Sequence, residues 1–113
     1  MENCMNVSIL GTEYKIELST KEQDPKLHDC NGYCDFSIKK CVIEKLDEQD
    51  ICTLGDADVF KRKVMRHEII HAFLAESGLR ENSEWGCYEE AVDWIAMQFP
   101  KMQKAFIECG CAE

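Results

Sequence analysis

The residues best suited to chemistry form one short run, His67-Glu68-Ile69-Ile70-His71. Residues four apart lie one above the other on a helix face, so the two imidazoles can bind one metal ion. Glu68 lies one position round from His67, where it can sit beside the metal without ligating it and take a proton from metal-bound water. The spacing therefore predicts a zinc ion (Zn2+) held by His67 and His71, with Glu68 as the general base.

The alternative is that these histidines cap or pack a helix and bind no metal. Two observations favour the metal. The run lies inside a segment with a helical pattern, and it contains two of the three histidines of the chain.

A helix from about residue 59 to 77 would carry this run. Asp56 or Asp58 can accept hydrogen bonds from the first backbone amides of that helix. Gly78 suits its end, because glycine readily adopts the left-handed conformation common after a helix. We therefore expect both imidazoles on one helix face.

A catalytic zinc usually has three protein ligands and one open position, so a third ligand must come from another element. A second helix is predicted from Ser83 or Glu84 to about Phe99. Pro100 either kinks it or starts a further helical segment through Phe106. The apolar stripe of this helix comprises Tyr88, Val92, Ile95, Phe99, Met102 and Phe106.

Helix geometry distinguishes the acidic residues of this second helix. Glu89 lies about 100° from the centre of the apolar stripe, and Glu90 about 200° from it. Glu89 therefore borders the buried face and can reach a metal on the first helix, whereas Glu90 points towards solvent. Asp93, one turn beyond Glu89, can accept a hydrogen bond from a ligand imidazole and fix its tautomer.

Other third ligands stay open at this point. Glu90 or Asp93 could bind directly, as could a cysteine or His28. Cys87 lies close to Glu89 in sequence, and a thiolate binds zinc well, although it would tend to close the site into a structural one. For each carboxylate, a solvated acidic helix face is the competing interpretation.

The first half of the chain is predicted to form strands. Segments 7–10 and 14–18 flank a short turn, and alternation in the second places its apolar side chains on one face. Segment 32–44 is typical of a second hairpin, with a polar turn at 37–40. The expected fold is α+β, with a small N-terminal antiparallel β-sheet packed on a pair of helices.

Composition restricts the partners. The 113 residues suggest a single domain, 1–113, and the net charge of −9 disfavours nucleic acid and anionic membranes. No apolar run approaches the roughly 20 residues that span a bilayer. The N-terminus has no signal-peptide pattern, so we expect a cytoplasmic protein whose eight cysteines are reduced thiols.

The pattern His67-Glu68-x-x-His71 followed by Glu89-x-x-x-Asp93 resembles the gluzincins, which combine an HExxH motif with a downstream glutamate. The segment Gly32-Tyr33-Cys34-Asp35 before a strand, and Asp93-Trp94-Ile95-Ala96 after Glu89, look more like the ImmA/IrrE-type and phage-encoded small metallopeptidases. The resemblance covers about residues 32–99.

This resemblance implies a zincin-type helix pair, made of the HExxH helix and the glutamate helix. It implies His67, His71 and Glu89 as zinc ligands, Glu68 as general base, and a bacterial or phage-derived cytosol. The expected function is zinc-dependent hydrolysis of peptide bonds in an unidentified protein or peptide substrate, and members of the resembled family include peptidases that cleave regulatory proteins.

Two points are left open by the sequence. Tyr33, Tyr88 and Arg80 are all available to stabilise the oxyanion. The alternative function is a non-catalytic zinc-stabilised interaction module, which a fourth protein ligand such as Cys87 would favour and which has no need of Glu68.

Overall fold

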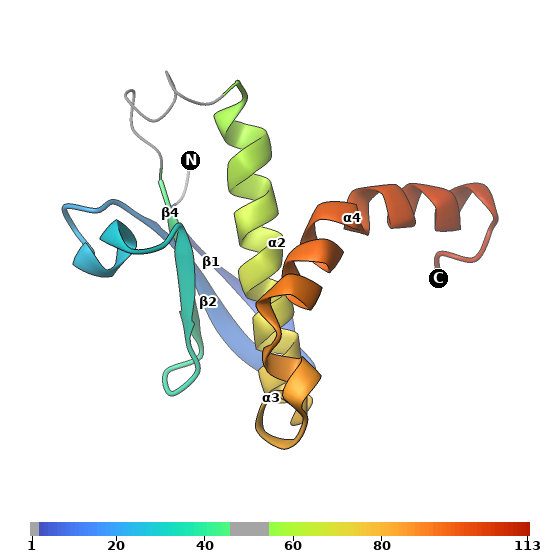
Figure 1. The fold of residues 1–113 in the computed structure, drawn as a ribbon, viewed down its shortest axis with the longest axis horizontal. Coiled ribbons are helices and arrows are strands. Elements are labelled where there is room, and N and C mark those ends of the chain that lie inside the picture. The colour runs from blue at the N-terminus through green and yellow to red at the C-terminus, as the bar shows by residue number, and fades with distance from the viewer. Residues whose placement is uncertain (1–2, 46–54) are drawn as a thin grey trace.

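The computed structural model describes residues 3–45 and 55–113. It confirms the expected α+β fold, with strands in the first half and helices in the second (Figure 1). In chain order the elements are β1 (Cys4–Ile9), β2 (Thr12–Ser19), the 3-10 helix η1 (Pro25–His28), β3 (Gly32–Asp35), β4 (Lys40–Glu44), α2 (Ala57–Glu76), α3 (Leu79–Asn82), the 3-10 helix η2 (Glu84–Cys87) and α4 (Glu89–Glu108).

The described strands form one sheet in the order β1-β2-β4-β3. Both predicted hairpins are confirmed: β1 pairs antiparallel with β2, and β3 pairs antiparallel with β4. Leu10 and Gly11 join the first pair with positive φ angles of 50° and 88°, as a tight hairpin turn requires. The expectation of a wholly antiparallel sheet was wrong, because β2 and β4 run parallel.

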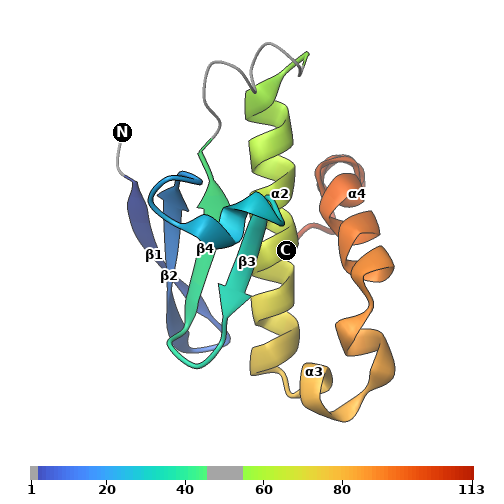
Figure 2. The same cartoon turned by 60° about the vertical axis from the view of Figure 1, so that its left-hand side comes forward.

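The core lies between the sheet and α2. The alternation predicted for β2 is confirmed, since Tyr14, Ile16 and Leu18 are all buried. They pack with residues of β4 and with Val64 and Ala72 of α2. Figure 2 shows α2 lying against the sheet, with α4 beside α2 on the side away from β1 and β2. The helix with the two histidines is thus anchored on one face and open to α4 on another.

The ends of α2 agree closely with those expected. Asp56 is the N-cap, and its carboxylate accepts a hydrogen bond from the backbone amide of Val59 at 3.1 Å. Gly78 follows the C-terminus with a φ of +87°, which a side-chain-bearing residue adopts only with strain. These two signals define a helix of 20 residues around the two histidines.

The second helix begins later than expected. Residues 84–87 form η2 rather than the first turn of the predicted helix, and Tyr88 is extended. Gly86 is packed so closely on α3 that an added Cβ would lie 2.5 Å from the carbonyl oxygen of Leu79. This close approach holds η2 against α3, so α4 starts at Glu89.

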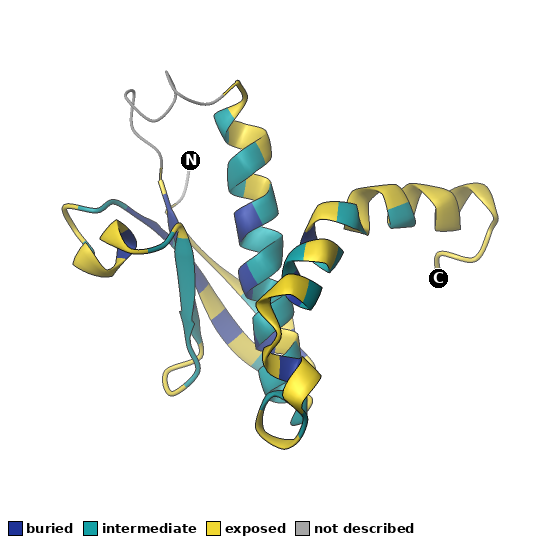
Figure 3. Ribbon diagram, in the orientation of Figure 1, coloured by how far each residue is buried: buried dark blue, intermediate teal, exposed yellow. Residues whose placement is uncertain are grey.

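Helix α4 continues through Pro100 to Glu108, and it bends away from the body of the protein (Figure 1). A proline inside a helix removes one backbone hydrogen bond and favours such a bend. Only Val92 and Ala96 of α4 are fully buried, while Phe99 and Phe106 are exposed. Figure 3 shows that the C-terminal part of the helix is mostly exposed. Of the predicted apolar stripe, Val92 is buried and Ile95 and Met102 are partly buried, whereas Tyr88 at its start is exposed as well. Within the described part of the chain, no helix has the length and apolar character to cross a bilayer.

Gly32 allows β3 to approach α2. A Cβ there would lie 3.0 Å from both the Val42 carbonyl oxygen and Val64 Cγ1, and 3.2 Å from Glu68 Cγ.

We predict that Gly32→Ala lowers the free energy of unfolding by about 1–3 kcal/mol through overpacking, measured by urea denaturation of metal-free protein. Gly55→Ala is the control, because its added Cβ would meet no described atom within 4 Å. Equal stability of the two variants would contradict the close contact.

Candidate metal centre

His67 and His71 lie one turn apart on α2 and face the start of α4. Their side chains are largely buried, with exposed fractions of 17% and 13%. The two Nε2 atoms are 3.2 Å apart. Both rings thus present the same nitrogen to one point beside α2.

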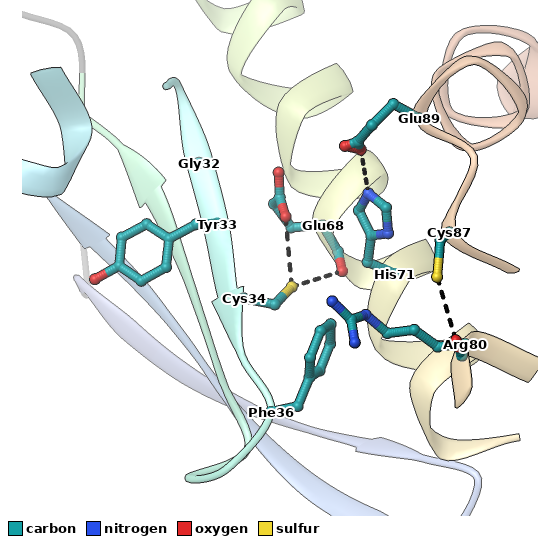
Figure 4. Close-up of a pocket in the computed structure, with 9 residues that line it drawn as sticks. All are labelled: Gly32, Tyr33, Cys34, Phe36, Glu68, His71, Arg80, Cys87 and Glu89. Carbon is teal, nitrogen blue, oxygen red and sulfur yellow. Dashed lines mark hydrogen bonds and ion pairs between the residues drawn. The ribbon is translucent and has the colours of Figure 1, made fainter. Parts of the chain in front are cut away.

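Glu89 supplies the third group from the first turn of α4. Its Oε1 lies 2.6 Å from His71 Nε2 and 3.1 Å from His67 Nε2. Figure 4 shows Glu89 and His71 pointing towards each other from their two helices. The side chain of Glu89 is 68% exposed, so the point where the three atoms meet is open to solvent on the α4 side.

Asp93 lies behind His67. Its Oδ1 is 3.1 Å from His67 Nδ1 and 3.3 Å from Lys63 Nζ. If His67 donates its Nδ1 proton to this carboxylate, the lone pair of its Nε2 points at Glu89 and His71. Asp93 therefore lies where it is expected from the sequence, within hydrogen-bond distance of His67.

The donor types, two imidazoles and a carboxylate, are those that zinc binds. Zinc bonds of about 2.0–2.2 Å at tetrahedral angles place ligand atoms about 3.3 Å apart. The His67–His71 and His67–Glu89 distances of 3.2 and 3.1 Å are near that value, whereas the His71–Glu89 distance of 2.6 Å is shorter and is that of a hydrogen bond. Lone pairs brought so close repel one another unless a proton or a cation lies between them. Within the described residues, these three form the group that could hold a metal ion.

Both acidic residues at this point are held ionised. Burial opposes ionisation of Glu89, but its hydrogen bonds to His71 and His67 outweigh burial and lower the pKa of Glu89. Burial likewise opposes ionisation of Asp93, and contacts with Lys63 and His67 lower the pKa of that carboxyl. At neutral pH, one carboxylate can ligate a cation while the other orients an imidazole.

Glu68 lies on the side of α2 that faces β3, and it lines the same cavities as Glu89 of α4. It is 7% exposed, and the thiol of Cys34 donates hydrogen bonds to its backbone oxygen at 3.1 Å and to its Oε1 at 3.4 Å (Figure 4). Burial raises the pKa of Glu68, and the neighbouring His67, Cys34 and His71 only partly oppose that effect. A raised pKa suits a general base, which works best when its pKa is near the operating pH.

Two cavities meet at this carboxylate. One, of about 300 Å³, lies on the His71 side, and the other, of about 290 Å³, lies on the His67 side. Gly32, Glu68 and Glu89 line both of them. A trough thus runs along β3 and passes Glu68 and Glu89 in turn.

The structure distinguishes the three candidates for stabilising an oxyanion, which are Tyr33, Tyr88 and Arg80. The hydroxyl of Tyr33 donates to Asp24, and its ring points away from Glu68 (Figure 4). Tyr88 is exposed. Arg80 lines the His71-side cavity, with its guanidinium carbon 4.6 Å from the centre of the Phe36 ring. Of the three, Arg80 is the donor that the structure brings to the trough beside Glu68.

Other ligand candidates lie elsewhere. His28 is exposed at the end of η1, and Glu90 is exposed on α4. The thiol of Cys87 lines the cavity but donates to the backbone oxygen of Arg80 at 3.2 Å. Among the described residues, the group that could hold a metal does not include them. From the sequence, Gly32 and Cys34 were used only as part of a segment that resembles small metallopeptidases and were given no role in the site, and Phe36 was not named.

Comparison with protein families, with curated proteins and with solved structures finds no match for this chain.

The neighbouring pair Glu89 and Glu90 offers a matched test. We predict that Glu89→Gln lowers zinc affinity at least tenfold in a competitive titration with a chromogenic chelator, because a neutral amide is a poor substitute for the ligating carboxylate. Glu90→Gln makes the same change in charge one residue away and should bind zinc like the wild type. Equal affinity of both variants would show that Glu89 is not a ligand.

Proposed function

We propose that this protein is a zinc-dependent metallopeptidase that hydrolyses peptide bonds in a protein or peptide substrate. One observation carries the proposal: a buried carboxylate, Glu68, borders the same trough as the group His67, His71 and Glu89. A site that served structure alone would have no need of a buried acid there, because burying an ionisable group carries a cost in stability.

Zinc, when bound, would act as a Lewis acid that polarises the scissile carbonyl and lowers the pKa of water. His67, His71 and Glu89 would hold it, and Asp93 would keep the tautomer of His67 suited to ligation. Glu68 would accept a proton from water and later pass it to the leaving amine. Arg80, with its fixed charge at the cavity, would interact with the oxygen on which negative charge develops.

Strand β3 supports a peptide as the substrate. In the described sheet it is an edge strand, and three of its four residues, Gly32, Tyr33 and Cys34, line the first cavity. An edge strand offers unpaired backbone groups to which an extended peptide can bind by main-chain hydrogen bonds. The absence of a side chain at Gly32 lets this strand pack close to Glu68, which brings the strand edge near the proposed base.

The proposal also includes the specific helix arrangement, the identity of the metal and the cellular location expected from the sequence. We infer that α2 and α4 form a zincin-type pair, with the HExxH run on the first helix and the glutamate on the second. Zinc as the metal, a cytoplasmic location and a phage-like or bacterial setting are part of the same proposal. The net charge of −9 supports a protein partner rather than nucleic acid.

The alternative is a non-catalytic zinc-stabilised interaction module. It would gain support from a fourth protein ligand, for which Cys87 was the candidate. The hydrogen bond of Cys87 to the Arg80 carbonyl occupies its thiol in another contact. The open, solvent-exposed side of Glu89 favours a site with a free position, as catalysis requires.

The catalytic part of the proposal is tested by Glu68→Gln. The amide keeps the shape of the side chain but cannot accept the proton, so we expect cleavage to fall by about 10²–10⁴-fold. The measurement is mass-spectrometric detection of new peptide termini in a proteome-derived peptide library treated with zinc-loaded protein.

Two controls accompany this test. Glu68→Gln should retain about one zinc per chain, since the residue is not a proposed ligand. Glu90→Gln should cleave like the wild type. Equal cleavage by wild type and Glu68→Gln would rule out the general base.

A further inference from the structure

Two thiols meet behind the proposed general base. Cys34 of β3 and Cys41 of β4 are directly opposite each other in the antiparallel pair, and their Sγ atoms are 3.0 Å apart. Opposite residues in antiparallel strands have Cα separations of about 4.5–5.5 Å, within the range that a disulfide spans. All seven cysteines in the described part of the chain are free thiols.

The two thiols differ in access. Cys34 is half-buried and lines the His71-side cavity, whereas Cys41 is completely buried. A small reagent entering the cavity would therefore meet Cys34 first. Cys41 lies behind it, already in position to react with a modified Cys34.

We propose that Cys34 and Cys41 form a reversible oxidation site, in which a disulfide replaces the thiol that donates to Glu68. The donor is lost because a disulfide has no S–H group. Both hydrogen bonds from Cys34, to the backbone oxygen and to Oε1 of Glu68, would be removed at once.

The oxidant is a low-molecular-weight disulfide. The thiolate of Cys34, after losing its proton to water, attacks one sulfur and forms a mixed disulfide, while the first small thiol leaves with the electron pair of the broken S–S bond and takes up a proton. Cys41 then attacks Cys34 Sγ in the same way and releases the second small thiol. Two protein thiols are oxidised, and one small disulfide is reduced to two thiols.

The site is built to stay reduced without such a reagent. Its hydrogen bond with Cys41, and burial, raise the pKa of Cys34. Since the thiolate is the reacting form, Cys34 reacts slowly at neutral pH. Once Cys34 carries a mixed disulfide, closure by Cys41 is intramolecular and needs only a small movement of two adjacent atoms.

The test uses bis(2-hydroxyethyl) disulfide on the full chain. This probe is small and uncharged, so the acidic protein does not repel it. We expect non-reducing peptide mapping to show a cross-link between the tryptic peptides 27–39 and 41–45, with the loss of two hydrogens, and dithiothreitol to reverse it. Fragmentation of the first peptide distinguishes Cys34 from Cys30.

Variants sharpen the result. Cys41→Ser should stop at Cys34 carrying one hydroxyethylthio group, and Cys34→Ser should leave Cys41 unmodified because it is buried. Cys30→Ser and Cys87→Ser are matched controls near the same cavities and should still form the cross-link. A cross-link absent from wild type, or one that survives Cys41→Ser, would overturn the proposal.

The effect on catalysis rests on the proposed function. Removing the donor to Glu68 should lower the cleavage rate of zinc-loaded protein about tenfold, with zinc content unchanged. An unchanged rate in fully cross-linked protein would overturn the coupling to Glu68. If the reduced protein cleaves no peptide, the proposed function fails, while the cross-link is still judged by mass alone.

Discussion

The structure depends on the close approach of two imidazole nitrogens and one carboxylate oxygen, each of which carries a lone pair unless it is protonated. Nε2 of His67, Nε2 of His71 and Oε1 of Glu89 lie within 3.2 Å of one another. Placing lone pairs so close is stable only when a proton or a cation lies between them. The packing of two helices must therefore hold this arrangement, and the cation that occupies it would in turn hold the helices.

The contacts around this point supply that support. Val92 and Ala96 in the N-terminal half of α4 are buried, and Arg66 of α2 donates a hydrogen bond to the Ala96 carbonyl oxygen at 2.7 Å. On the other side, Gly32 lets β3 come close to α2, so Glu68 is enclosed between strand and helix. The same helix thus presents His67 and His71 towards α4 and Glu68 towards β3. This division places a possible base beside a possible metal without using the base as a ligand.

Local patterns predicted the parts of this centre that depend on one helix. The four-residue spacing of His67 and His71 needs only helix geometry, and Asp56 and Gly78 mark the ends of that helix. Glu89 was preferred to Glu90 on the expectation that both lie inside a helix that begins at Ser83 or Glu84. The structure brings Glu89 to the histidines, but from the first turn of α4, because Gly86 holds the preceding residues in η2.

Local sequence patterns did not predict the features that depend on contacts between segments far apart in the sequence. The parallel pairing of β2 with β4 follows from strand order in the sheet, which alternation within each strand does not reveal. The meeting of Cys34 with Cys41 depends on the register of β3 and β4, and the thiol–Glu68 contact depends on how the sheet packs on α2. The exposure of the C-terminal half of α4 was not predicted either. An apolar stripe does not show how far along the helix the rest of the protein packs against it.

The most direct test of the central claim is zinc-edge X-ray absorption spectroscopy on the purified protein at one zinc per chain. The proposed site predicts nitrogen and oxygen ligands at about 2.0–2.2 Å, with the scattering pattern of two imidazoles and an open position filled by solvent. A sulfur ligand at about 2.3 Å would instead indicate a cysteine-closed structural site. That result, or a protein that binds no zinc, would contradict the account.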